Sequence, residues 1–311
     1  MGVAALAVPI VVVVLGVVGL WFGARLFVDA AAALARRVGL SDLVIGLTVV
    51  AVGTSLPELV VSVDAVLAGS GAVAVGNVVG SNVYNVAVVL GVTAVFGTVE
   101  ASRAVLRRDA VALVGTSVLA FAVLRDGQLT RPEAGLLFAL LAGYLLVLAR
   151  ADDEQGDVPQ MEVTRPARTA VELGVGLGLV VASGHLLVDS AVTLARSAGI
   201  SEWAIGATLV AAGTSTPELA VSLAALARGR TGVSVGNVVG SSVFNVLGVL
   251  GVAGLIRPLS VGRTALADLR WLVVLTVLTV VVLWTGRRLT RAEGLLLVAS
   301  EAGRWTVDLI G

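Results

Sequence analysis

The chain has 311 residues, of which 58% are hydrophobic and 14% are charged, and its mean hydropathy is +1.03. This composition is typical of a protein with many membrane-spanning segments and excludes an ordinary soluble domain. The absence of cysteine excludes disulfides and thiolate metal sites. The 21 basic and 21 acidic residues balance, without a basic stripe that would indicate nucleic acid binding.

Apolar runs long enough to cross a bilayer predict ten helices. The predicted spans are 3–35, 43–69, 72–97, 107–125, 130–150, 169–195, 203–228, 233–256, 267–286 and 291–309. The first run lacks a positively charged start and continues past Leu20, so we expect a membrane helix rather than a cleaved signal. A polar stretch then divides the chain into a first five-helix repeat, a linker and a second five-helix repeat: 1–150, 151–168 and 169–311.

The two halves carry the same motifs, 160 residues apart and without a gap. The first copy reads Ala51-Val-Gly-Thr-Ser-Leu-Pro-Glu58 and then Val75-Gly-Asn-Val-Val-Gly-Ser81-Asn-Val-Tyr-Asn85. The second reads Ala211-Ala-Gly-Thr-Ser-Thr-Pro-Glu218 and then Val235-Gly-Asn-Val-Val-Gly-Ser241-Ser-Val-Phe-Asn245. Because five is an odd number of crossings, the second half must run in the opposite sense. We therefore predict an all-α polytopic membrane protein of two inverted-topology repeats, an arrangement that places a transporter's substrate at the repeat interface.

Arginine counts predict the orientation. Thirteen arginines lie near helix ends on the side of the linker, and seven lie on the other side. Positively charged loops stay inside the cell, so we expect the linker in the cytoplasm and both termini outside, in the cell membrane.

Each motif places oxygen atoms around a buried acid. Thr54, Ser55 and Glu58 share one helix face by their spacing, and Pro57 lacks the N–H that the carbonyl four residues earlier needs. We expect the carbonyls around Ala51 to Gly53 to be loosened from the helix. Ser81 and Asn85 are also one turn apart on the following helix, and the glycines before them allow close helix packing.

The second copy repeats this arrangement, and the sum is a set of oxygen ligands with two carboxylates. Kinks and packing surfaces are the alternative reading of such residues, but a buried acid in each copy favours a site. Oxygen ligands suit hard cations such as Na⁺ and Ca²⁺. The candidate ligands are Ala51, Thr54, Ser55, Glu58, Ser81, Asn85, Ala211, Thr214, Ser215, Glu218, Ser241 and Asn245.

Over nearly its whole length the chain resembles the prokaryotic sodium/calcium exchangers of the cation/calcium exchanger superfamily, whose repeats carry Gly-Thr-Ser-x-Pro-Glu and Gly-Asn-x-x-Gly-Ser. The resemblance implies that helices 2, 3, 7 and 8 form the ion site, and that helices 1 and 6 slide against the rest. It implies a central calcium site of Glu58, Glu218, Thr54 and Thr214, completed by Asn85 and Asn245. It also implies flanking sodium sites, one of Ala51, Thr54, Ser55, Ser81 and Glu218, the other of Ala211, Thr214, Ser215, Ser241 and Glu58.

The resemblance implies an antiporter that exchanges sodium for calcium across the cell membrane and extrudes calcium electrogenically. One departure is Asn245, where many relatives carry Asp. A proton/calcium antiporter and, less favoured, a passive cation channel stay open as alternatives. The sequence has no nucleophile–base pair or cofactor loop that would indicate an enzyme, and we expect no cofactor and no obligate protein partner. For Asp29 and Asp189, which recur in the first and sixth predicted helices, structural pairing is favoured over gating; Glu301 has no assigned role.

Overall fold

The computed structural model describes residues 3–38, 40–100, 105–153, 166–197, 211–261 and 263–310, and this part of the chain is mainly helical. The first half contains α1 (Val3–Val38), α2 (Asp42–Ile45), η1 (Gly46–Val50), α3 (Ala51–Thr54), α4 (Leu56–Leu67), α5 (Gly71–Tyr84), η2 (Asn85–Val89), α6 (Leu90–Phe96), β1 (Val99–Glu100), η3 (Val105–Asp109), α7 (Ala110–Leu124), β2 (Gln128–Leu129) and α8 (Arg131–Asp153). The second half contains α9 (Pro166–Ser197), α11 (Ala211–Thr214), α12 (Thr216–Ala227), α13 (Thr231–Phe244), η5 (Asn245–Val249), α14 (Leu250–Ile256), β3 (Leu259–Ser260), α15 (Arg263–Gly286), β4 (Arg288–Leu289) and α16 (Arg291–Ile310). The η segments are π-helical turns within longer helices.

Six helical segments of the described chain are long and apolar enough to cross a membrane: Val14–Leu34, Gly71–Phe96, Arg131–Arg150, Pro166–Leu186, Thr231–Ile256 and Ala265–Gly286. A bent pair, Asp42–Thr54 with Leu56–Leu67, makes a seventh if it is one span. Large apolar side chains are exposed on the outer helices, for example Trp21 of α1 and Leu146 of α8, as a bilayer requires. The chain is therefore a multi-pass helical membrane protein. The predicted span 203–228 begins at residues outside the described ranges.

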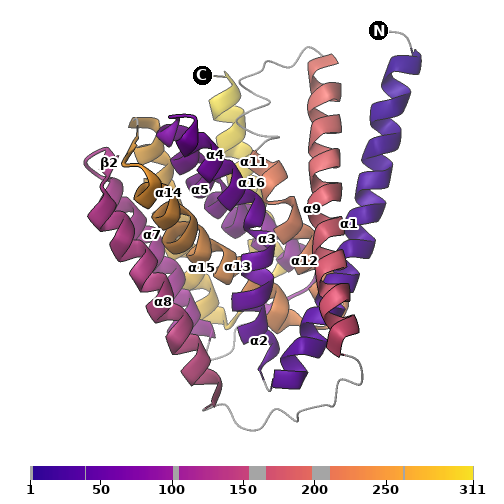
Figure 1. Ribbon diagram of the computed structural model, residues 1–311, viewed down its shortest axis with the longest axis horizontal. Coiled ribbons are helices and arrows are strands. Elements are labelled where there is room, and N and C mark those ends of the chain that lie inside the picture. The colour runs from indigo at the N-terminus through magenta and orange to yellow at the C-terminus, as the bar shows by residue number, and fades with distance from the viewer. Residues whose placement is uncertain are drawn as a thin grey trace.

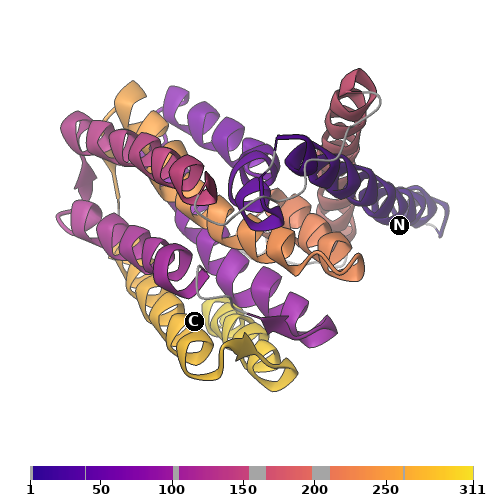
Figure 2. The same ribbon diagram turned by 90° about the horizontal axis from the view of Figure 1, so that it is seen from below.

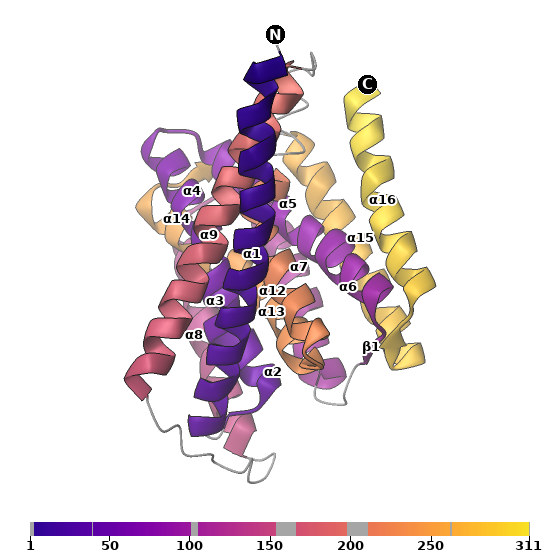
Figure 3. The ribbon, with the colours of Figure 1, turned by 90° about the vertical axis from the view of Figure 1, so that its right-hand side faces the viewer.

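The long helices α1 and α9 pack along each other at one side of the molecule, and the other helices form a bundle next to them (Figures 1, 2 and 3). Asp29 of α1 forms an ion pair with Arg228, the residue that caps α12. In its counterpart Asp189, Oδ2 lies 3.3 Å from Nε2 of His185 on the same helix. Asp29 thus pairs two helices, as favoured from the sequence, whereas Asp189 makes a local contact.

The two halves are interlocked rather than placed side by side. Strand β1 pairs with β4, so that Val99 lies opposite Leu289, and β2 pairs with β3, so that Leu129 lies opposite Leu259. A shift of 160 residues turns the first pairing into the second. Helix packing follows the same exchange, because α6 packs on α16 and α14 packs on α8. Each half therefore completes its hydrophobic core with elements of the other half.

Glycines bring α13 against η1 and α3, as the small-residue pattern predicts. A Cβ atom on Gly240 would lie 2.6 Å from the carbonyl oxygen of Leu47 and 2.7 Å from the Cβ of Ala51. One on Gly236 would lie 2.6 Å from the carbonyl oxygen of Leu43. Backbone thus touches backbone, and α13 is held directly beside the motif of the other half. The segment equivalent to Leu43 and Leu47 lies outside the described ranges, so the same prediction for Gly76 and Gly80 stays a prediction.

Gly240→Ala is expected to destabilise the protein, since the added methyl group meets backbone atoms that cannot move aside. Overpacking of this kind costs about 1–3 kcal/mol. Gly115→Ala in α7 is the control, because a Cβ there meets nothing within 4 Å and alanine favours helix by up to about 1 kcal/mol. Thermal unfolding in detergent should place Gly240→Ala below the wild type and Gly115→Ala at or above it. Equal stabilities would contradict the close packing.

Glu301, for which the sequence indicates no role, is buried in α16 and forms an ion pair with Arg304, whose Nη2 lies 2.6 Å from its Oε1. Nη1 of Arg304 also lies 3.2 Å from Oδ1 of Asp268 in α15. This cluster joins the last two long helices. Arg304 compensates the buried charge of Glu301, so the acid has a structural explanation.

Candidate cation site

Each half contains one broken helix, and the break lies at a serine of the repeated motif. The backbone of Ser55, between α3 and α4, has φ −87° and ψ 8°, and that of Ser215, between α11 and α12, has φ −93° and ψ 10°. The segments on either side of Ser55 are bent by 43°. Pro57 causes the break, since proline has no N–H to donate to the carbonyl of Gly53. The bend places polar groups of the motif at a break in the middle of a membrane helix.

The predicted release of the Ala51 carbonyl is corrected by the structure. Its oxygen keeps a helical hydrogen bond from the N–H of Ser55 at 3.1 Å. The same oxygen also accepts bonds from the hydroxyls of Thr54 at 3.3 Å and Ser241 at 3.4 Å. Helix geometry survives there because the donor four residues later is Ser55 and not the proline. Ala51 nevertheless presents its carbonyl to the side chains of the motif.

The two carboxylates are fully buried, and each is held by a serine of the other half. Ser215 donates to Oε1 of Glu58 at 3.0 Å, and Ser55 donates to Oε1 of Glu218 at 3.0 Å. Both glutamates are 0% exposed. Ser81 adds a weaker bond to Oε1 of Glu58 at 3.4 Å. The acids therefore lie where the two halves meet, and neither half holds its own acid alone.

The remaining hydroxyls also contact side chains of the other half. Thr54 Oγ1 and Ser241 Oγ are 3.3 Å apart, and Ser81 Oγ and Thr214 Oγ1 are 3.4 Å apart. The structure joins nine of the predicted ligands in two hydrogen-bonded groups, one around each glutamate: Ala51, Thr54, Ser55, Ser241 and Glu218, and then Ser81, Thr214, Ser215 and Glu58. Ala211 begins α11, at the place that Ala51 has in α3.

Asn85 and Asn245 each begin a π-helical turn, η2 and η5, a feature that often marks functional positions. Both side chains are buried. Asn245 donates to the amide oxygen of Asn82 at 3.3 Å, and Asn82 donates to the carbonyl of Ser242 at 3.2 Å. Among the described residues, Asn85 has no hydrogen-bond partner for either amide atom and Asn245 has none for its Oδ1. Among the described residues, none of these hydrogen bonds reaches either glutamate.

Asn77 and Asn237 support the site and were missed as candidates. Asn237 donates to the carbonyl of Glu218 at 3.1 Å and to Ser222 at 3.0 Å. Asn77 makes the equivalent bonds to the carbonyl of Glu58 at 3.1 Å and to Ser62 at 3.0 Å. Asn237 also accepts a bond from Thr54 at 3.0 Å. The signal was available, because both asparagines recur inside the quoted motif at the same offset.

The electrostatics around the two glutamates favour a positive partner. Within the described part of the chain, Oε2 of Glu58 and Oε2 of Glu218 have no hydrogen-bond partner, and neither acid forms an ion pair. An uncompensated buried carboxylate costs several kcal/mol. Among the described residues no group of three or more His, Cys, Asp or Glu could hold a metal ion. The side chains bonded to the two carboxylates are neutral hydroxyls. Such a set suits hard cations.

Comparisons with known proteins agree with this chemistry. The family model described as "Sodium/calcium exchanger protein" matches residues 8–150 and 169–300. The chain is 36% identical over 309 residues to the putative antiporter CaxA of Alkalimonas amylolytica, covering 95% of this chain and 97% of that protein. It is 30% identical to the sodium/calcium exchanger MaX1 of Methanosarcina acetivorans, covering 94% and 96%. A solved structure of the sodium-calcium exchanger NCX_Mj soaked with Na⁺ and Sr²⁺ is similar with a TM-score of 0.84 and 29% identity, covering 98% and 99%.

Asn237→Leu is expected to lower the stability of the protein, since it removes the hydrogen bonds of Asn237 with Ser222, Thr54 and the carbonyl of Glu218. Unsatisfied buried groups cost about 1–3 kcal/mol each. Ser234→Ala, earlier on α13, is the control, because its buried hydroxyl lacks a partner in the described structure. Thermal unfolding should show a loss for Asn237→Leu and little change for Ser234→Ala. A stable Asn237→Leu protein would show that this side chain does not hold the broken helix.

Proposed function

This chain belongs to the sodium/calcium exchanger family, and from that premise we propose that it exchanges Na⁺ for Ca²⁺ across the cell membrane and extrudes calcium. Membership of this transporter family makes it a multi-pass cation/calcium antiporter and not an enzyme. One observation carries the proposal for sodium and calcium. Two fully buried glutamates, each bonded to a serine of the other half, keep one carboxylate oxygen without a partner in the described structure.

The proposed calcium position lies between the two glutamates, because one divalent ion balances two carboxylates. Thr54 and Thr214 would add neutral oxygens there, and Asn85 and Asn245 would complete the centre. The proposed sodium positions flank it. One uses Ala51, Thr54, Ser55, Ser81 and Glu218, and the other uses Ala211, Thr214, Ser215, Ser241 and Glu58. Each broken helix contacts the small-residue helix of the other half, because Ser241 contacts Thr54 of the first set and Ser81 contacts Thr214 of the second. These contacts favour an exchange of Ser81 and Ser241 between the two sodium positions.

The proposed architecture has ten membrane helices in two inverted repeats, 1–150 and 169–311, joined by a cytoplasmic linker over 151–168. Both termini are then outside. The exchange of strand pairing between the halves supports a two-fold relation. In the proposed cycle, α1 and α9 slide together against the bundle and open the site to one side at a time. Their extensive packing along each other supports a movement of the two helices as a pair.

Sodium is favoured over protons as the counter-ion because both copies keep Gly-Thr-Ser-x-Pro-Glu intact. Hydroxyl and carbonyl oxygens around a single carboxylate are ligands for a sodium ion, whereas proton transfer needs only the carboxylate. A calcium flux driven by a pH gradient alone, with no sodium present, would favour the proton-coupled alternative. Calcium flux with no counter-ion gradient at all would favour a channel.

Glu58→Gln and Glu218→Gln are each expected to reduce calcium transport at least about 100-fold, since one charge of the divalent ion then lacks its partner at low dielectric. Asp64→Asn is the matched control, because Asp64 is an exposed acid on the same helix as Glu58. The measurement is sodium-driven uptake of radioactive calcium into vesicles that contain the purified protein. Near-normal uptake by either glutamine variant would move the site elsewhere.

Transport is expected to depend on membrane voltage. One Ca²⁺ neutralises the two carboxylates, whereas three Na⁺ at the same acids leave one positive charge, so an exchange of three for one moves net charge. Clamping the vesicle potential with a potassium ionophore should change the initial rate of sodium-driven calcium uptake, and a reversed potential should change it in the opposite direction. Uptake rates that do not change with the potential would indicate an electroneutral exchange of two Na⁺ for one Ca²⁺.

A further inference from the structure

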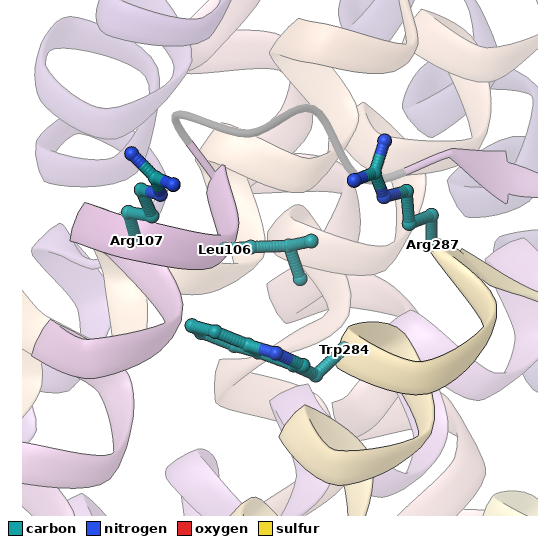
Figure 4. Close-up of a pocket in the computed structure, with 4 residues that line it drawn as sticks. All are labelled: Leu106, Arg107, Trp284 and Arg287. Carbon is teal, nitrogen blue, oxygen red and sulfur yellow. The ribbon is translucent and has the colours of Figure 1, made fainter.

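A pocket of about 260 Å³ lies away from the candidate cation site, between η3 and the end of α15. It is lined by Leu106, Arg107, Trp284 and Arg287. Figure 4 shows the two arginines on either side of Leu106, with the ring of Trp284 beneath it. Two cations and an indole ring at the end of a membrane helix are typical of the boundary between lipid chains and headgroups.

The backbone of Arg287 is in the left-handed region, with φ 52°, and among the described residues it is the only non-glycine with positive φ. A shift of 160 residues places Arg287 on Gly127, whose φ is 84°. At another tight turn the two copies both keep glycine, Gly69 with φ 83° and Gly229 with φ 68°. A side chain makes this conformation unfavourable, and glycine avoids the cost. The second copy therefore has an arginine at position 287 despite the backbone strain, which indicates that the charge of this side chain has a function.

Both guanidinium groups are available for an anion. In the described part of the chain neither Arg107 nor Arg287 forms an ion pair. The nearby acids are engaged elsewhere: Asp109 lies 2.7 Å from Nε of Arg108, and Glu293 accepts bonds from Thr290 at 2.7 Å. The strand register places Glu100 opposite Arg288. The pocket thus keeps the charge of two arginines.

Apolar stripes lead from the two arginines along the membrane. On α15 the exposed side chains recur at helical spacing, with Trp284 at 54% exposure and then Val281, Leu278, Val277 and Val274. On α7, Val111 and Val118 are exposed on the face that begins with Arg107. The two helices pack together and have their arginines at the same end. A bound molecule would therefore have an anionic head at the arginines and apolar chains along the stripes.

We propose that Arg107, Arg287 and Trp284 bind the headgroup of an anionic phospholipid, with its acyl chains on the exposed faces of α7 and α15. A basic pocket between membrane helices suits the phosphate of such a lipid. A freely dissolved anion would use the arginines but not the stripes. This site is separate from the cation site, and the proposal does not depend on which ions the protein exchanges.

The test measures which lipids stay on the purified protein by native mass spectrometry from micelles that contain phosphatidylglycerol and phosphatidylcholine. The wild type should retain phosphatidylglycerol preferentially. Arg107→Gln and Arg287→Gly should each weaken this retention about five-fold, the equivalent of about 1 kcal/mol for one arginine near a lipid surface. Arg125→Gln, at the other end of α7, is the control of equal charge change and should retain the lipid as the wild type does.

Thermal unfolding separates lost binding from lost folding. In phosphatidylcholine alone, Arg287→Gly should unfold at a higher temperature than the wild type, because glycine removes the backbone strain. Phosphatidylglycerol should raise the unfolding temperature of the wild type, and it should do so less for this variant. Unchanged lipid preference in Arg287→Gly, equal loss in Arg125→Gln, or equal stabilisation of the wild type by inorganic phosphate would each overturn the proposal.

Discussion

The structure depends on two carboxylates that lie inside a membrane protein without a basic partner among the described residues. Neither Glu58 nor Glu218 is exposed, and each receives one strong hydrogen bond from a serine of the opposite half. Those bonds compensate only part of the cost of burying two charges at low dielectric. A bound cation or a proton can supply the rest, so the way the protein folds favours binding of positive ions between the two halves.

This constraint explains the other unusual features around the acids. The helix breaks at Ser55 and at Ser215, and the hydroxyl of each of these serines reaches the carboxylate of the other half. Asn77 and Asn237 then satisfy the backbone beside each acid, in the same way in both halves. Gly236 and Gly240 let α13 approach the opposite broken helix closely enough for its polar side chains to reach across. Each of these features positions oxygen atoms near the two acids.

Duplication makes the site almost two-fold, and the exceptions are informative. Ser81 bonds to the carboxylate of Glu58, whereas its counterpart Ser241 bonds to the carbonyl of Ala51. The surroundings of the two acids therefore differ in this conformation, as alternation between two sides of a membrane would require. Away from the site the copies diverge further. Asp29 joins α1 to the end of α12 while Asp189 stays within its own helix, and an arginine replaces glycine at position 287.

The sequence by itself determined the class of protein and indicated most residues of the buried polar groups around the two acids. Hydropathy indicated membrane helices, and the repeated Thr-Ser-x-Pro-Glu placed a carboxylate and two hydroxyls on one helix face, because both signals depend only on local spacing. Only the tertiary structure decided which residues meet. The bond from Ser55 reaches Glu218 rather than Glu58, and Asn237 accepts a bond from Thr54. The expectation of a released Ala51 carbonyl failed, since proline removes only the hydrogen bond that its own nitrogen would have donated. Contacts between residues more than 150 positions apart are fixed by helix packing across the two halves, and no local pattern records them.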